Sequence, residues 1–280
     1  MDTLIEAAWL IRHLDDPQLR MLECSVTFVD AADGTISFHS GRADWEKGHI
    51  PGSAFADLID DLADPESQLD FTLPSAERFA RAMGALGVGK GTQVVLYDRT
   101  YGMWATRLWW MLRAFGFDDA AVLNGGFAAW RTAGGPIDDR PSAYALTTFE
   151  PHFRRGMFVG KDDVRAALSD PNTCLIDALR PHIYRGDQVP YARPGHIAGA
   201  INVPMVELTD ADSRRFLDDD LLRERFSAAL GRSSVITYCG AGIAATVDAF
   251  LLQRLGHQRV SIYDGSLSEW SADPSLPMET

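Results

Sequence analysis

The sequence predicts an α/β protein of two domains, each a parallel sheet flanked by helices. Three observations support this prediction. The chain has 280 residues, enough for two units of about 100–200 residues each. Similar segments occur twice in the same order, as expected of a duplicated fold. Within each copy, short apolar runs alternate with helix-length apolar periodicity, a pattern that favours parallel strands covered by helices.

Three pairs of matching segments define the repeat. Each pair keeps its place in the order, which chance does not explain. The pairs are "DPQLRMLE" from Asp16 with "DPNTCLID" from Asp170, "GHIPGSAFADL" from Gly48 with "GHIAGAINVPM" from Gly195, and "LNGGFAAW" ending at Trp130 with "IYDGSLSEW" ending at Trp270.

Each copy is predicted to contain the same elements in the same order. A helix and a strand come first, and the Gly-His-Ile turn leads into a second short strand, followed by a helix. A strand, a loop and a helix are then expected over residues 93–116 in the first copy and 234–256 in the second, before a last strand. Residues 132–153 lack strong periodicity, so we expect domains of residues 1–145 and 146–280.

Composition excludes several classes of function. The formal net charge of -13 disfavours nonspecific binding to nucleic acid or to an anionic membrane, but small anions remain possible ligands. No apolar run approaches the ~20 residues of a membrane-spanning helix, and the N-terminus begins acidic. Three scattered cysteines are too few for a disulfide framework. We therefore expect a cytoplasmic protein, and the sequence does not indicate its oligomeric state.

The two strand-loop-helix segments differ at the loop. Aligning Tyr97 with Tyr238 places Asp98 opposite Cys239, and the first loop is one residue longer. A carboxylate cannot perform thiolate chemistry and would repel an anionic substrate. The second domain is therefore predicted to be catalytic and the first to be inactive.

Cys239 is predicted to be the nucleophile, because it lies where ligands gather in parallel-sheet folds, at the carboxyl end of a strand. Small residues follow it, so that consecutive backbone amides and a helix N-terminus can form an anion-binding nest. Such surroundings favour the ionised thiol, and a thiolate is a nucleophile near neutral pH. The residues predicted to form this nest are Gly240, Ala241, Gly242, Ile243, Ala244 and Ala245.

Other conspicuous residues are predicted to be structural. Cys24 and Cys174 lie in or beside apolar strands with no nest sequence after them, so they are interpreted as small buried residues. His49 and His196 recur in both copies, and their rings are expected to hydrogen-bond the backbone at the turn. Residues 104–112 carry tryptophans and leucines at helical spacing, which indicates packing. No metal-ligand spacing and no nucleotide-binding glycine pattern occurs, so no cofactor is expected.

With these features together, the chain resembles the tandem rhodanese family of sulfurtransferases over essentially its full length. Asp98 matches the loop position of that family's inactive first domain, and "CGAGIA" from Cys239 matches the six-residue loop of its active second domain. The resemblance implies that Cys239 takes a sulfane sulfur from a small anionic donor, becomes a persulfide, and passes the sulfur to cyanide or a thiol. It implies no metal and no organic cofactor.

The resemblance also implies two donor-binding arginines, Arg185 and Arg193, since guanidinium groups suit carboxylate or sulfonate oxygens. Family members that prefer thiosulfate carry basic residues after the loop cysteine, where this chain has Gly240 and Ala241. Members that prefer 3-mercaptopyruvate have the loop sequence Cys-Gly-Ser-Gly, and Ala241 lacks the hydroxyl of that serine. These members also tend to have a histidine at the position that corresponds to Phe71. The sequence therefore favours 3-mercaptopyruvate over thiosulfate only slightly.

Two other functions remain open from the sequence alone. A loop-cysteine phosphatase or arsenate reductase needs a longer loop and an arginine near its end, and Ala244, Ala245 and Thr246 supply none. A noncatalytic rhodanese-like binding module is compatible with the missing hydroxyl at Ala241. The presence of Cys239 argues against such a module.

Overall fold

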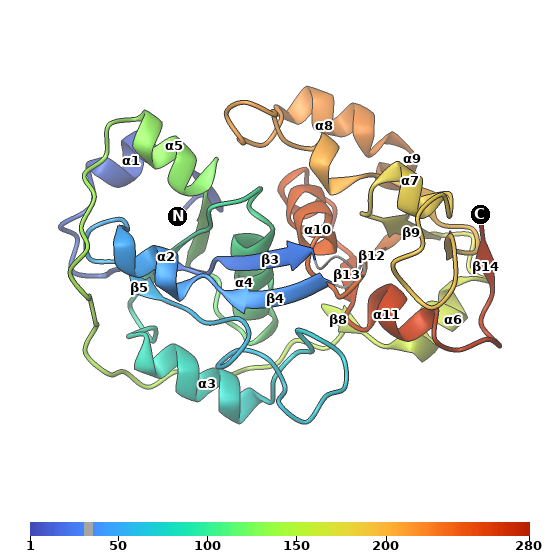
Figure 1. Ribbon diagram of the computed structural model, residues 1–280, viewed down its shortest axis with the longest axis horizontal. Coiled ribbons are helices and arrows are strands. Elements are labelled where there is room, and N and C mark those ends of the chain that lie inside the picture. The colour runs from blue at the N-terminus through green and yellow to red at the C-terminus, as the bar shows by residue number, and fades with distance from the viewer. Residues whose placement is uncertain (31–35) are drawn as a thin grey trace. The chain divides into compact units, whose positions relative to one another are not determined.

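A computed structural model describes residues 1–30 and 36–280, which form two compact units (Figure 1). Unit 1 contains residues 1–66, 73–154 and 211–216. Unit 2 contains residues 67–72, 155–210 and 217–280. Each unit holds one copy of the repeat.

The main boundary lies between residues 154 and 155, later than the predicted position after residue 145. The stretch before it packs on unit 1 through backbone hydrogen bonds. Thr147 donates to the Gly84 carbonyl at 3.0 Å, and Arg154 donates to the Ala114 carbonyl at 2.7 Å. Such pairing leaves no periodic pattern in the sequence, and for this reason the sequence alone predicts an earlier boundary.

The sheet of unit 1 is parallel throughout, as predicted. Its central strand reads Gln-Val-Val-Leu-Tyr, and β-branched and aromatic side chains suit a strand buried on both faces. A separate antiparallel pair, β3 (Val26–Asp30) and β4 (Ile36–Ser40), was not predicted. The sheet strands, in spatial order, are β1 (Leu4–Ile5), β7 (Ala120–Leu123), β6 (Gln93–Tyr97), β2 (Leu19–Glu23) and β5 (Ala54–Phe55).

The longest helix described in unit 1, α4, packs against β6 and β7. Trp104, Trp109 and Trp110 on this helix are almost completely buried, which confirms that the tryptophan-rich stretch serves packing. The helices described in this unit are α1 (Ala7–Ile11), α2 (Arg42–Lys47), α3 (Ala76–Ala85), α4 (Met103–Ala114) and α5 (Gly126–Thr132).

The sheet of unit 2 repeats that of unit 1 strand for strand. The register is also the same, because Glu23 pairs with Tyr97 in unit 1 and Asp177 pairs with Tyr238 in unit 2. The strands, in the corresponding spatial order, are β8 (Phe158–Val159), β13 (Val260–Tyr263), β12 (Ser234–Tyr238), β9 (Thr173–Asp177) and β11 (Ile201–Asn202).

Helix α10 of unit 2 packs against β12 and β13, as α4 does against β6 and β7. A short antiparallel pair, β10 (His196–Ile197) and β14 (Met278–Glu279), joins the turn to the C-terminal segment. The helices are α6 (Lys161–Ala167), α7 (Pro181–Tyr184), the 3₁₀ helix η1 (Met205–Glu207), α8 (Asp219–Arg225), α9 (Ser227–Leu230), α10 (Ala245–Arg254) and α11 (Ser266–Trp270).

None of the helices formed by residues 1–30 and 36–280 has both the length and the apolar character that crossing a membrane requires.

Candidate active site

Cys239 lies at the carboxyl end of β12, the middle strand of the unit 2 sheet, and α10 begins at Ala245. This is the position predicted from the sequence, and it is where parallel sheets place their ligand sites. The Cys239 residue is only 2% exposed. The nucleophile candidate therefore sits at the base of a loop rather than on the surface.

The loop curls so that alternate amides face the sulfur. The backbone N–H groups of Ala241, Ile243 and Ala245 hydrogen-bond to Cys239. Gly242 adopts a left-handed backbone with φ of 68°, a conformation that glycine accepts without steric cost. These three amides point at the sulfur, whereas the amide of Gly242 donates to the Ser266 hydroxyl. The substrate-binding role of residues 240–245 stays a prediction.

Ser266, the first residue of α11, holds the Cys239 loop through side-chain hydrogen bonds. Its hydroxyl accepts hydrogen bonds from the amides of Cys239 at 3.2 Å and Gly242 at 3.0 Å, and it donates to the Tyr263 carbonyl at 2.8 Å. Ser266 is fully buried and has a φ of 48°, which is strained for a residue with a side chain. The corresponding residue of unit 1 is Gly126, which has no hydroxyl to offer.

The acid-base state of the resting thiol differs from the prediction. Burial raises the pKa of Cys239, and the nearby Asp177 carboxyl raises it further. The amides of Ala245, Ala241 and Ile243 lower it, but they do not outweigh burial. The prediction that the nest keeps the resting thiol ionised is therefore wrong for the donor-free protein. The amides instead stand ready to hold charge when it develops on sulfur.

In unit 1 the corresponding nest is filled by the chain's own carboxylate. One oxygen of Asp98 accepts hydrogen bonds from the amides of Thr100 at 2.9 Å and Gly102 at 3.1 Å. The other accepts from the amides of Trp104 at 3.0 Å and Ala105 at 3.1 Å. The loop that follows the middle strand in each unit is therefore built to hold an anion, and in unit 1 that anion is Asp98.

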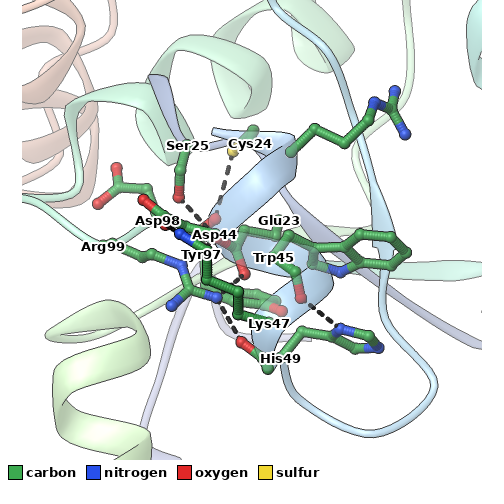
Figure 2. A network of polar contacts seen from close by, with 12 residues as sticks. Glu23, Cys24, Ser25, Asp44, Trp45, Lys47, His49, Tyr97, Asp98 and Arg99 are labelled. Atoms are coloured by element: carbon green, nitrogen blue, oxygen red, sulfur yellow. Dashed lines mark hydrogen bonds and ion pairs between the residues drawn. The ribbon is translucent and has the colours of Figure 1, made fainter. Parts of the chain in front are cut away.

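A second difference between the units lies beside each loop. In unit 1, the buried Glu23 carboxylate pairs with the Arg99 guanidinium and accepts from the Ser25 hydroxyl at 2.9 Å (Figure 2). Arg99 also donates to the Gly48 carbonyl at 2.6 Å. Because position 99 corresponds to Gly240, unit 2 has no cation at this place in the loop.

The counterpart of Glu23 in unit 2 is Asp177, which is fully buried. Its Oδ1 accepts from the Leu179 amide at 2.8 Å. Burial raises the pKa of Asp177 to about 7, although the Tyr238 hydroxyl close to the carboxyl lowers it. Asp248 on α10 is also fully buried, with no hydrogen-bond partner for either oxygen among the residues described, and burial and Asp177 raise its pKa well above the usual range.

These carboxyls make stability depend on pH. An unfolded aspartate has a pKa of about 3.9. At pH values between this pKa and the raised pKa of the folded state, the native protein binds more protons than the unfolded chain. The free energy of unfolding should therefore fall as pH rises. For Asp177, this loss of unfolding free energy begins at about pH 4. It is complete once the pH exceeds the pKa of Asp177 in the folded protein, about 7.

We expect Asp248→Leu to stabilise the protein, because the corresponding residue of α4, Leu108, is a fully buried leucine. Removing an unpartnered buried polar group should raise the free energy of unfolding by about 1–3 kcal/mol, and by more at pH 8 than at pH 5. Urea unfolding at the two pH values measures this. Asp248→Asn, which cannot ionise, should help mainly at pH 8, and a loss of stability at pH 8 in both variants would contradict the assignment.

The two predicted donor-binding arginines have different surroundings. Arg185 is 57% exposed in its side chain and pairs with Asp187 at 2.9 Å. Arg193 donates to four backbone carbonyls, those of Trp270, Ser271, Asp273 and Leu276, at 2.7–3.0 Å. Its donor-binding role stays a prediction, and these contacts weigh against it because they occupy the guanidinium with main-chain acceptors.

The two turn histidines have the structural role predicted for them. His49 Nδ1 lies 2.7 Å from the Trp45 carbonyl, and His196 Nδ1 lies 2.8 Å from the Tyr184 carbonyl. Each ring also stacks on the ring of that same residue, with centroids 4.2 Å and 3.6 Å apart. The prediction that both rings hydrogen-bond backbone at the turn is confirmed.

The remaining cysteines are buried, as predicted. Cys24 lies 3.4 Å from the Tyr97 carbonyl oxygen (Figure 2), and burial raises the pKa of its thiol, as it does for Cys174. Within the part of the chain that the structure describes, no group of three or more His, Cys, Asp or Glu side chains is arranged to hold a metal ion.

Three residues of this site were not identified from the sequence. Ser266 could have been noticed, because the aligned Gly125-Gly126 and Gly265-Ser266 differ only there. The sequence did not indicate Asp177, or Tyr191, whose hydroxyl lies beside Gly240. Their burial and their closeness to the loop arise from tertiary packing.

The Rhodanese-like domain family matches this chain twice, over residues 6–133 and 161–273. The chain therefore belongs to the rhodanese family, with one domain in each unit. It is an enzyme of the sulfurtransferase class.

Relatives match along nearly the whole chain. The 3-mercaptopyruvate sulfurtransferase of Escherichia coli K12 is 33% identical over 280 residues, covering 98% of this chain and 97% of that protein. The human 3-mercaptopyruvate sulfurtransferase is 32% identical, covering 95% and 91%. The crystal structure of SseA from Escherichia coli, described as having the rhodanese fold, superposes with a TM-score of 0.83 at 30% identity, covering 96% of this chain and all of that one.

Proposed function

We propose that this protein transfers the sulfur atom of 3-mercaptopyruvate to cyanide or a thiol acceptor through a persulfide on Cys239. The donor's thiol sulfur forms a bond to the Cys239 sulfur as its bond to carbon breaks. The C–S electron pair leaves on carbon as an enolate, which takes up a proton to give pyruvate. In the second step the acceptor removes that terminal sulfur. Splitting the transfer in this way replaces one difficult displacement by two easier ones.

The observation that supports this proposal most strongly is the nest around Cys239. Three amides converge on the sulfur, and the same construction in unit 1 holds a full carboxylate, Asp98. Preorganised amides that can hold an anion stabilise charge developing on a thiolate or on a persulfide. The resting thiol is neutral, so its proton must leave as the donor binds.

The surroundings of the loop favour 3-mercaptopyruvate over thiosulfate. Gly240 and Ala241 supply no cation, whereas a dianion such as thiosulfate gains most from a fixed positive charge. The test is steady-state turnover of both donors with cyanide as acceptor. We expect the higher kcat/KM with 3-mercaptopyruvate, and turnover of neither donor would overturn the proposal.

We expect Arg185→Ala to weaken use of anionic donors, because the donor carboxylate would lose a charge-assisted hydrogen bond of about 1.5–3 kcal/mol. The effect should appear as a KM increase of about tenfold or more. Asp187→Ala, which frees the guanidinium from its partner, is the matched control and should not raise KM. Unchanged kinetics in Arg185→Ala would remove this residue from the site.

A further inference from the structure

We propose that Tyr191 is the proton donor of the Cys239 site and that its hydroxyl sets the preference for a carbon-bound sulfur donor. The inference rests on the proposed function and assigns one residue a role in it. Tyr191 lies in the segment between α7 and β10, and its ring packs against the hydrophobic core of unit 2.

The hydroxyl of Tyr191 lies beside Gly240, the residue that directly follows the nucleophile. A Cβ atom added to Gly240 would collide with the Tyr191 oxygen. The hydroxyl therefore occupies the volume that a side chain directly after Cys239 would need. A side chain at position 240 would have to displace the phenol.

The Tyr191 segment and the Cys239 loop are fixed on one support, the region of α11. The Ala192 amide donates to the Ser271 hydroxyl at 3.2 Å, next to the four carbonyls that hold Arg193. From the same helix, Leu267 donates to the Cys239 carbonyl at 3.0 Å. Because both segments are tied to this helix, the phenol is held in place against the loop, and Arg193 acts as a positioning residue.

The phenol is available to donate its proton. Among the described residues its oxygen has no hydrogen-bond partner, so the proton is not committed to the protein. Burial raises the pKa of Tyr191, and the nearby Cys239 and Asp177 raise it further. The side chain therefore stays protonated, which is the state that a proton donor needs.

With 3-mercaptopyruvate, the Cys239 thiol first loses its proton to water. The resulting thiolate attacks the donor's thiol sulfur, the S–S bond forms, and the C–S electron pair leaves on carbon as the pyruvate enolate. Tyr191 gives its proton to that enolate, producing pyruvate. The tyrosinate then takes the proton of the new Cys239–S–SH group, which leaves the persulfide anion facing the amides. The phenol is restored, and the one proton released overall is the proton that Cys239 gave to water.

A donor whose leaving group departs without a proton should not need Tyr191. Polysulfide is such a donor, because its leaving group is already a stable sulfur anion. The two donors therefore separate proton donation from nucleophilic attack.

The test compares Tyr191→Phe with the wild type in single-turnover persulfide formation. We expect the rate with 3-mercaptopyruvate to fall by about 10²-fold, and the rate with polysulfide to change by less than about threefold. Alkylation of Cys239 by iodoacetamide should be unchanged. The matched control is Tyr184→Phe, whose hydroxyl donates to the Ala200 carbonyl, and it should not discriminate between the donors.

Equal losses with both donors, or no loss with either, would overturn the role of Tyr191. A wild type that forms no persulfide with either donor would instead overturn the proposed function, so the two failures are distinguishable. If Tyr191→Phe does not fold, the contact is tested by comparing the variants Gly240→Ala and Gly240→Ala/Tyr191→Ala. The methyl group of Gly240→Ala should slow sulfur transfer when Tyr191 is present, and should slow it no further when Tyr191 is alanine. If the two substitutions instead lower the rate additively, the contact between these positions is overturned.

Discussion

Replacing Cys239 with serine is expected to abolish sulfur transfer, with kcat/KM lower by about 10³-fold or more. A serine hydroxyl fits the same space, so the nest and the fold should survive. It cannot form a persulfide, however, and the loss is therefore chemical. Steady-state turnover with 3-mercaptopyruvate and cyanide measures the effect, and urea unfolding checks that the variant is folded.

Cys24→Ser and Cys174→Ser are the matched controls for that variant. Both thiols are buried, and neither follows the middle strand of its sheet. We expect each of them to keep its turnover within about threefold of the wild type. Residual transfer in Cys239→Ser, or loss in a control variant that is folded, would place the nucleophile elsewhere.

Asp98→Ala is expected to lower the free energy of unfolding by about 3–5 kcal/mol. The carboxylate is buried and accepts hydrogen bonds from four loop amides. Without it, these amides lose their partner in a place that water does not easily reach. Urea unfolding of the full chain measures the change.

Asp98→Asn should have an intermediate effect, because an amide oxygen can satisfy only part of the nest. Asp162→Ala is the control, since that side chain is 93% exposed, and it should change stability by no more than about 0.5 kcal/mol. An Asp98→Ala variant as stable as the wild type would show that the unit 1 loop does not depend on an anion, and would weaken the same interpretation of the Cys239 loop.

The features predicted correctly were those that the repeat makes visible. Two copies of one pattern fixed the element order and the parallel sheets, and they placed Asp98 opposite Cys239. The same comparison showed that His49 and His196 are structural, because a residue common to both copies cannot explain a difference between them. Local spacing is enough for these inferences, since each depends on neighbours along the chain.

The features missed depend on segments far apart in the sequence. The backbone acceptors of Arg193 could not be predicted, because they lie around Trp270 and Leu276, far along the sequence. The thiol of Cys239 was predicted to be ionised because the amides are visible in the sequence, whereas its depth of burial is not. For the same reason nothing signalled Asp177, whose pKa follows from burial without a cation.

The two repeats differ in the side chain that stands at the end of the middle strand, Asp98 in unit 1 and Cys239 in unit 2. In each loop, backbone amides at the end of the middle strand converge on this side chain. In unit 1 the neighbouring buried carboxylate, Glu23, is neutralised by Arg99. In unit 2 that space is left to Gly240 and Tyr191, which keeps the region beside Cys239 free of fixed positive charge.

The most direct test of this account is to locate the transferred sulfur. The wild-type chain is mixed with 3-mercaptopyruvate without an acceptor, the free thiols and persulfides are capped, and the peptides are mapped by mass spectrometry. The account predicts one added sulfur atom on the peptide that contains Cys239, removed when cyanide is supplied. Added sulfur on Cys24 or Cys174, or none on any cysteine, would contradict it.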